Sequence, residues 1–216
     1  MQTLVWTAET YVQLLDRARA LLEREERAIL GIAGAPACGK STLCAELGVD
    51  LQRSHPSEVA LVGMDAFHIG HRVLQQHDLV DVKGAPKTFD VDGYLALLSR
   101  LRHSRTTVYA PEFHREIEDS LAHVVEIPAQ VRLVITEGNY LLLPTPPWDQ
   151  VRTLLDEAWF VHLESSERQR RMVARHQRYG RTLAEARART FGSDETNAVL
   201  VDQEQNRADL RIECLT

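Results

Sequence analysis

The chain has 216 residues and a formal net charge of −6, an acidic balance that argues against general binding to nucleic acid or to anionic membranes. Hydrophobic residues make up 44% and charged residues 26%, so we expect one globular domain over residues 1–216. No apolar run reaches membrane-spanning length, and the three cysteines have neither disulfide-framework nor metal-ligand spacing. We therefore expect a reduced, cytoplasmic protein that binds a small-molecule substrate, with a homodimer left open.

Strand and helix patterns alternate along the chain. Apolar residues at helical spacing predict a first helix around residues 11–22, an apolar run predicts a buried strand at 28–33, and a helix follows over 41–53. Further strands are expected within 58–67, 131–143, 157–164 and 207–215, with a short extended piece in 106–113. Helices are expected over 91–101 and 165–181. This alternation predicts an α/β fold with a doubly wound parallel sheet.

The segment from Gly34 to Ser41 fits the pattern G-x-x-x-x-G-K-S, which predicts a phosphate-binding loop of the P-loop NTPase fold. Its backbone N–H groups would surround phosphate oxygens at the start of the next helix. Lys40 would reach the β- and γ-phosphates of ATP, and the Ser41 hydroxyl would bind Mg²⁺. Cys38 could be a reactive thiol near a helix N-terminus or a small filler residue. The expected nucleotide contacts are Gly34, Ala35, Pro36, Ala37, Cys38, Gly39, Lys40, Ser41 and Thr42.

Two carboxylates follow predicted strands, and the carboxyl ends of parallel strands lie at one edge of a sheet. We therefore expect Lys40, Asp65 and Glu137 to converge on one crevice. Asp65 could accept a proton from a hydroxyl group, hold Mg²⁺, or be an ordinary turn aspartate. Glu137 could support Mg²⁺ and water, or be a strand-end charge beside a glycine turn. Asp90 could cap the helix that follows it, bind sugar hydroxyls, or do both.

The predicted helix over 165–181 is strongly basic. Arg168, Arg171, Arg175 and Arg178 recur at spacings of three and four, so they share one face. A charged face is usually a solvated one, but no acidic residue stands between Arg168 and Arg181. A face of one sign, in a chain with a phosphate loop, favours a lid over about 165–190 that closes on a transferring phosphate.

The motifs GAPACGKST, GMDAFH, KGAPKTFDVDGYLALLSRLR, VYAPEFHREIED, VITEGNYLLL and TNAVLV occur in this order. Together with the arginine helix, they resemble the superfamily of P-loop kinases that comprises uridine kinase, phosphoribulokinase and bacterial pantothenate kinase. Within it, the chain is most similar to the nucleoside kinase-like proteins named fructose transport system kinases. The resemblance extends from about residue 29 to residue 212.

The resemblance implies an enzyme that transfers the γ-phosphate of ATP, with Mg²⁺, to a hydroxyl of a sugar (fructose-like) or nucleoside. A pantothenate-type kinase, or a regulatory NTPase without an acceptor, is the alternative. Asp65 would be the catalytic base, beside Lys40, and Glu137 with Ser41 would serve the metal. The implied substrate contacts are Asp65, Phe89, Asp90, Tyr109, His114, Arg115 and Arg181, with Arg171 and Arg175 as catalytic lid arginines. His114 replaces an aspartate found in many relatives, which bears on acceptor choice.

Overall fold

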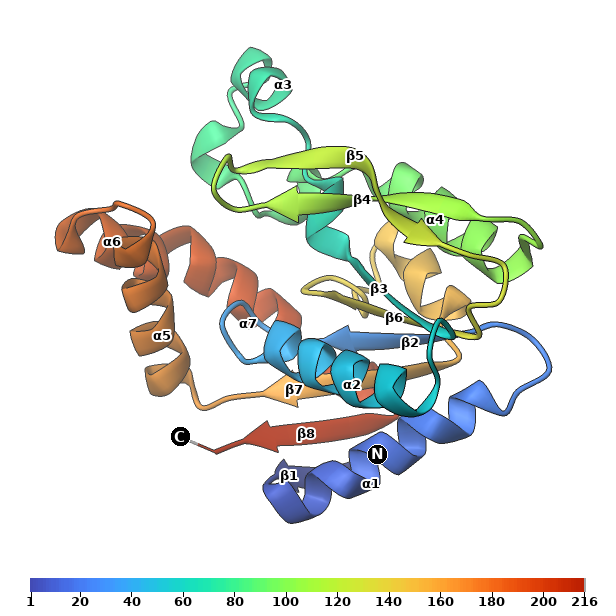
Figure 1. Cartoon of the computed structure of the whole chain (residues 1–216). Helices are drawn as coiled ribbons and strands as arrows, with labels where there is room; N and C mark the ends of the chain where they lie inside the picture. The colour runs from blue at the N-terminus through green and yellow to red at the C-terminus, as the bar shows by residue number, and fades with distance from the viewer. Residues whose placement is uncertain (216) are drawn as a thin grey trace.

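A six-stranded sheet, parallel at every pairing, forms the centre of the computed structural model, which describes residues 1–215 (Figure 1). Its strand order is β1-β8-β7-β2-β6-β3. The strands of this sheet are β1 (Gln2–Trp6), β2 (Ala28–Ala33), β3 (Val59–Gly63), β6 (Leu133–Gly138), β7 (Glu157–His162) and β8 (Leu210–Cys214). The predicted α/β fold with a doubly wound parallel sheet is confirmed.

Helices cover both faces of the sheet. On one face α1 and α2 pack through Leu14, Leu43 and Leu47, and on the other α4 packs through Tyr94 and Leu98. Each face has its own buried cluster, since neighbouring side chains of a strand point to opposite sides. The helices are α1 (Ala8–Leu22), α2 (Lys40–Ser54), α3 (His71–Gln76), α4 (Val91–His103), α5 (Ser165–Arg178), α6 (Leu183–Arg189) and α7 (Glu195–Asp202).

Strand β2 is the part of the sheet that places the phosphate loop. All six of its residues are buried, and it pairs with β6 on one side and β7 on the other. Such a strand is a continuous apolar run because both of its faces are covered. Its carboxyl end leads directly into residues 34–39 and then into α2, so the loop lies at the centre of the sheet's carboxyl edge.

Two strands were not predicted from the sequence. Strand β1 is an edge strand whose residues are exposed or only partly buried, so it lacks a buried apolar run. Strand β5 (Asp119–Ile127) pairs antiparallel with β4 (Val108–His114), and this hairpin stands apart from the central sheet. Only the last residue of β5, Ile127, is buried, which explains why its pattern was missed.

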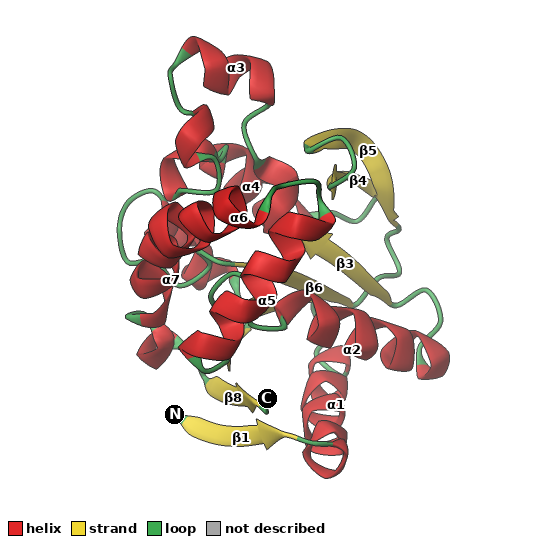
Figure 2. Ribbon diagram, turned by 90° about the vertical axis from the view of Figure 1, so that its left-hand side faces the viewer, coloured by secondary structure: helices red, strands yellow, loops and turns green. Residues whose placement is uncertain are grey.

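Helices α5 and α6 extend beyond the carboxyl ends of the strands, and Figure 1 shows them across an opening from the β4–β5 hairpin. In Figure 2 the two helices lie in front of these strand ends. A π-helical segment at Thr190–Asp194, with a non-helical backbone at Gly192, joins α6 to α7. Within residues 1–215, no helix combines the length and apolar character needed to cross a membrane.

Candidate active site

The phosphate loop has the backbone conformation that its glycines permit. Gly34 and Gly39 have φ values of 149° and 110°, in the left-handed region that favours glycine. A Cβ atom on Gly34 would also collide with the carbonyl oxygen of Val161 and lie 2.8 Å from Cys38 Sγ. Ala37 adopts φ of 66°, so the loop keeps its fold with a non-glycine residue at a left-handed position.

Lys40 is the first residue of α2 and only 6% exposed. Its Nζ donates to the carbonyl oxygen of Ala35 at 3.1 Å and to Asn139 Oδ1 at 2.9 Å. Both acceptors are neutral, so the ammonium group carries an uncompensated charge toward the pocket. Such a group is suited to bind an anion, as expected of a lysine that reaches phosphates.

The hypothesis of a reactive Cys38 is wrong. Its side chain is 1% exposed, and burial raises the pKa of the thiol although Lys40 lowers it. A buried, protonated thiol is a poor nucleophile. Cys38 is instead a small residue that fills the space beneath the loop, in contact range of Gly34.

Ser41 and Glu137 meet above the start of α2. Ser41 Oγ donates to Glu137 Oε1 at 3.0 Å. Burial and the charge of Asp65 raise the pKa of Glu137, while Lys40 and Ser41 counteract this shift. These oxygen donors fit Mg²⁺, which prefers few protein ligands alongside water and substrate phosphates. Accordingly, residues 1–215 contain no cluster of three or more His, Cys, Asp or Glu side chains that could hold a metal by itself.

Asp65 lies just past β3, in a short 3₁₀ turn over Met64–Phe67. Arg115 Nη2 donates to its Oδ2 atom at 2.9 Å, and His68 Nδ1 lies 2.7 Å from its carbonyl oxygen. Burial raises the pKa of Asp65, but the charges of His68, Arg115 and Lys40 outweigh it, so the pKa falls below its usual range. The carboxylate is therefore ionised and faces the pocket, beyond what a turn aspartate requires.

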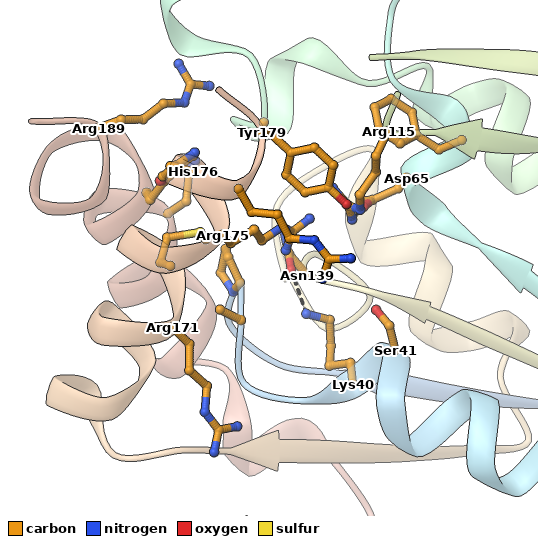
Figure 3. A pocket seen from close by; sticks show the side chains of 18 of the residues that line it. Lys40, Ser41, Asp65, Arg115, Asn139, Arg171, Arg175, His176, Tyr179 and Arg189 are labelled. Atoms are coloured by element: carbon orange, nitrogen blue, oxygen red, sulfur yellow. Dashed lines mark hydrogen bonds and ion pairs between the residues drawn. The ribbon is translucent and has the colours of Figure 1, made fainter. Parts of the chain in front are cut away.

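One pocket of about 800 Å³ joins these residues. Figure 3 shows Lys40 and Ser41 on one side, Asp65 and Arg115 on another, and Arg171 and other α5 side chains along the third. The structure thus brings Lys40, Asp65 and Glu137 together, as the strand ends predicted. The predicted site residues that line the pocket are Pro36, Ala37, Gly39, Lys40, Ser41, Thr42, Asp65, Arg115, Glu137, Arg171, Arg175 and Arg181.

The expected lid face is wrong for one member, because Arg168 does not lie on the side of α5 that faces the pocket. Arg168 is 1% exposed and pairs with Glu195 on α7, so it holds α5 against the body of the protein. Arg171 pairs with Glu167 at 2.7 Å, an acid that stands just before the segment from Arg168 to Arg181. Arg175 and Arg178 line the pocket, and within residues 1–215 neither has a carboxylate oxygen within 4.0 Å.

Four predicted substrate contacts lie outside this pocket. Phe89 is 5% exposed and packs among Tyr140, Trp148 and His68, so its ring belongs to the core. Asp90 caps α4 by accepting from the Gly93 N–H at 2.9 Å, which confirms the capping alternative. Tyr109 is exposed on the hairpin, and the His114 imidazole lies 3.4 Å from Glu112. Neither side chain lines the pocket.

Several pocket residues were missed in the sequence. Asn139 stands two residues after Glu137, so its place past a strand end was a usable signal. Lys83 and Phe113 contact each other across the pocket wall, at 5.4 Å from the ammonium nitrogen to the ring centre. Tyr179 ends α5, and Arg189 donates to the Lys83 carbonyl oxygen at 2.6 Å. No local pattern marks these four, because tertiary folding brings them to the site.

Comparison with known proteins matches this architecture, although no family model matches the chain. A protein of Schizosaccharomyces pombe assigned as a uridine kinase is 33% identical over 214 residues, covering 95% of this chain and 91% of the relative. The crystal structure of a protein from Silicibacter sp. TM1040 assigned as a fructose transport system kinase superposes with a TM-score of 0.84. Its sequence is 32% identical, over 94% of this chain and 98% of the other.

A pantothenate kinase of Latilactobacillus sakei is 31% identical over 140 residues, which cover 64% of this chain and 45% of that kinase. These relatives are kinases, and the first two match nearly the full length of the chain. The solved structure shares the fold of this chain. The chain therefore belongs to the superfamily of ATP-using P-loop kinases that includes uridine kinase, phosphoribulokinase and bacterial pantothenate kinase.

Proposed function

We propose that this chain transfers the γ-phosphate of ATP to a hydroxyl group of a small molecule of the sugar or nucleoside class. The observation that carries the proposal is a pocket of about 800 Å³ that joins the phosphate loop to the carboxylate of Asp65. A regulatory NTPase has no acceptor hydroxyl, so it would not need a carboxylate that takes a proton from one. The names of the two full-length relatives support a nucleoside or sugar acceptor.

In this proposal Asp65 orients the acceptor hydroxyl and takes its proton as the oxygen attacks the γ-phosphorus. The Lys40 ammonium, held by neutral oxygens, binds the phosphates and stabilises the charge that develops on them. Arg171 and Arg175 approach from α5 to do the same. Ser41 and Glu137 would hold Mg²⁺, which neutralises phosphate charge when bound.

Residues 165–190 would act as a lid in this mechanism. Helices α5 and α6 carry arginines over the pocket, and the segment at Thr190–Asp194 contains the non-helical Gly192, where the backbone could bend. Closure would exclude water while the phosphate transfers. Arg181, between the two helices, lines the pocket and would contact substrate in the closed form.

Two other functions give different experimental results. A pantothenate-type kinase would share the chemistry but use another acceptor, and the partial match to pantothenate kinase supports it less than the full-length matches support the first choice. A regulatory NTPase would bind ATP and show no transfer to any small molecule. A cytoplasmic location and a homodimer remain predictions from the sequence.

The test is a panel of acceptors incubated with ATP and Mg²⁺ and analysed by mass spectrometry for a phosphorylated product. The panel should contain free and phosphorylated sugars, sugar acids, nucleosides and pantothenate, with Asp65→Asn as the matched control. We expect at least one sugar or nucleoside compound to be phosphorylated by the wild type. Nucleotide binding without any phosphorylated product would contradict the proposal.

A further inference from the structure

The pocket has two ends, and Asp65 lies between them. The phosphate loop with Lys40 and Ser41 forms one end, and Figure 3 shows Arg115 beside Asp65 on the opposite side. The β4–β5 hairpin and the segment before α4 form this second end, which we call the acceptor end. Its lining residues are His68, Lys83, Gly84, Phe113, Arg115, Glu116 and Glu118.

Two cations stand at the acceptor end, close to one aromatic ring. Lys83 Nζ lies 5.4 Å and Arg115 Cζ 5.6 Å from the centre of the Phe113 ring. Arg115 has one ion pair, with Asp65. Lys83 donates to the Glu118 carbonyl oxygen and lies 3.7 Å from the carboxylate of that residue, which is largely exposed at the hairpin turn. Each of these two cations therefore has one carboxylate partner, and the partner of Lys83 is largely exposed to solvent.

The lid adds further positive charge. Arg175, Arg178 and Arg181 line the pocket, and within residues 1–215 none of them has a carboxylate oxygen within 4.0 Å. Burial and the positive charge of Arg115 lower the pKa of Arg175, as expected where guanidinium groups crowd together. The acids that also line the pocket are Asp65, Glu116, Glu118, Glu137 and Asp194.

Most of these acids have another partner or are exposed to solvent. Asp194 accepts from His176 at 2.6 Å, Glu137 from Ser41, and Glu116 is exposed at the hairpin turn. The triphosphate of ATP would occupy the cations near the loop, namely Lys40 and the α5 arginines closest to it. Lys83 and Arg115 lie across Asp65 from the loop, so the triphosphate would not reach them. With a neutral sugar or nucleoside as acceptor, they would keep only the carboxylates of Glu118 and Asp65 as partners.

We infer that the acceptor carries an anionic oxygen group, a phosphate monoester or a carboxylate, besides its reacting hydroxyl, and that Arg115 leaves Asp65 to bind that group. The inference rests on the proposed function and narrows it from free sugars and nucleosides to sugar phosphates and sugar acids. A guanidinium group binds such oxyanions in a bidentate way.

The exchange of partners by Arg115 has a chemical consequence. While Arg115 donates to Asp65, one carboxylate oxygen is occupied. When Arg115 moves to the acceptor, that oxygen becomes free to accept the hydroxyl proton. The acceptor oxygen then forms its bond to the γ-phosphorus, the bond from that phosphorus to the ADP oxygen breaks, and the proton goes to Asp65. A neutral acceptor has no anionic group that could replace Asp65 as the partner of Arg115.

The first test compares matched acceptors that differ by one anionic group. Fructose is paired with fructose 6-phosphate, and glucose with gluconate, and kcat/KM is measured for each with ATP and Mg²⁺. We expect the anionic member of at least one pair to be favoured by about 10- to 100-fold, the effect of one charge-assisted contact. Equal use of both members, or preference for the neutral ones, would overturn the inference and leave the proposed function standing.

If no member of either pair is phosphorylated, a measurement of anion binding tests the inference separately. Calorimetry with fructose 6-phosphate and with inorganic phosphate, in the presence of a non-hydrolysable ATP analogue, measures anion binding at the acceptor end. Binding that disappears in Arg115→Gln supports the inference. The absence of binding, or binding that is unchanged in Arg115→Gln, overturns it. The pair of probes distinguishes a sugar phosphate from a free phosphate ion.

Substitutions then assign the effect to Arg115. Arg115→Gln should lower kcat/KM for the anionic acceptor at least about 10-fold more than it lowers kcat/KM for the neutral counterpart. Arg115→Lys should restore part of the loss. Arg187→Gln is the matched control, since Arg187 stacks on Phe191 away from the pocket. Equal losses for both acceptors in a folded Arg115→Gln protein would contradict the inference.

Discussion

The two ends of the pocket are built in different ways. The phosphate-loop end joins the central strand β2 to helix α2, and its key side chains, Cys38 and Lys40, are buried. The acceptor end is formed by a two-stranded hairpin and the segment before α4, and its residues Phe113 and Arg115 remain partly exposed. The protein core therefore holds the phosphate loop, whereas partly exposed, charged side chains line the acceptor end.

The largest effect expected from a lid residue is that of Arg175→Ala. Arg175 lines the pocket without a carboxylate partner within 4.0 Å among the described residues, so its charge is available for the transferring phosphate. We expect kcat to fall by about 10²- to 10³-fold, as for other groups that stabilise developing charge. ATP affinity, measured by calorimetry, should change little because the phosphate loop carries most of it.

Arg170→Ala provides the control on the same helix. Arg170 pairs with Glu167 at 2.6 Å and its side chain is 72% exposed, so it makes no contribution to the pocket of Lys40 and Asp65. Its kcat should stay near that of the wild type. Equal losses of kcat in the Arg170 and Arg175 variants would contradict a specific role for Arg175.

Arg168→Ala should weaken the fold rather than the chemistry. The side chain is buried against α7, where it pairs with Glu195. Its removal leaves a cavity and an unpaired, partly exposed acid, for which we expect the free energy of unfolding to fall by about 2–4 kcal/mol. Urea denaturation measures this loss. A variant that keeps its stability but loses kcat would instead place Arg168 in the catalytic lid.

A smaller effect is expected for Arg115→Gln, on the dependence of kcat/KM on pH. The charges of His68, Arg115 and Lys40 together lower the pKa of Asp65 against the effect of burial. A base acts as a carboxylate, so activity is lost as the pH falls through its pKa. Removing the Arg115 charge raises that pKa, and the acid limb of kcat/KM should move to higher pH. Arg115→Lys should keep the limb in place, and an unmoved limb in Arg115→Gln would contradict the link.

The difference between the two ends also explains what the sequence could predict. The loop and Asp65 follow buried strands, and Glu137 lies at the end of one. The apolar runs of these strands located the three features, and the parallel topology brought them together. Asp90 was weighed as a helix cap because capping is a local interaction.

The acceptor end could not be predicted in the same way. Lys83, Phe113 and Tyr179 meet only after the hairpin and the lid have folded over the sheet. Helical spacing placed Arg168 on a face with Arg175, but the spacing alone could not tell a buried ion pair with α7 from a pocket residue. The side of a helix that packs against the rest of the protein depends on residues that are distant in the sequence.

The most direct measurement of the central proposal is a pair of titrations on the wild type and on Asp65→Asn. The substitution keeps the shape of the side chain and removes the proton acceptor. We expect transfer of phosphate to the acceptor to fall by about 10²- to 10⁴-fold. ATP affinity, carried by Lys40 and the loop amides, should stay nearly the same at several Mg²⁺ concentrations. Near-normal transfer by Asp65→Asn, or a loss that added Mg²⁺ restores, would contradict the role of Asp65 as the base between the two ends of the pocket.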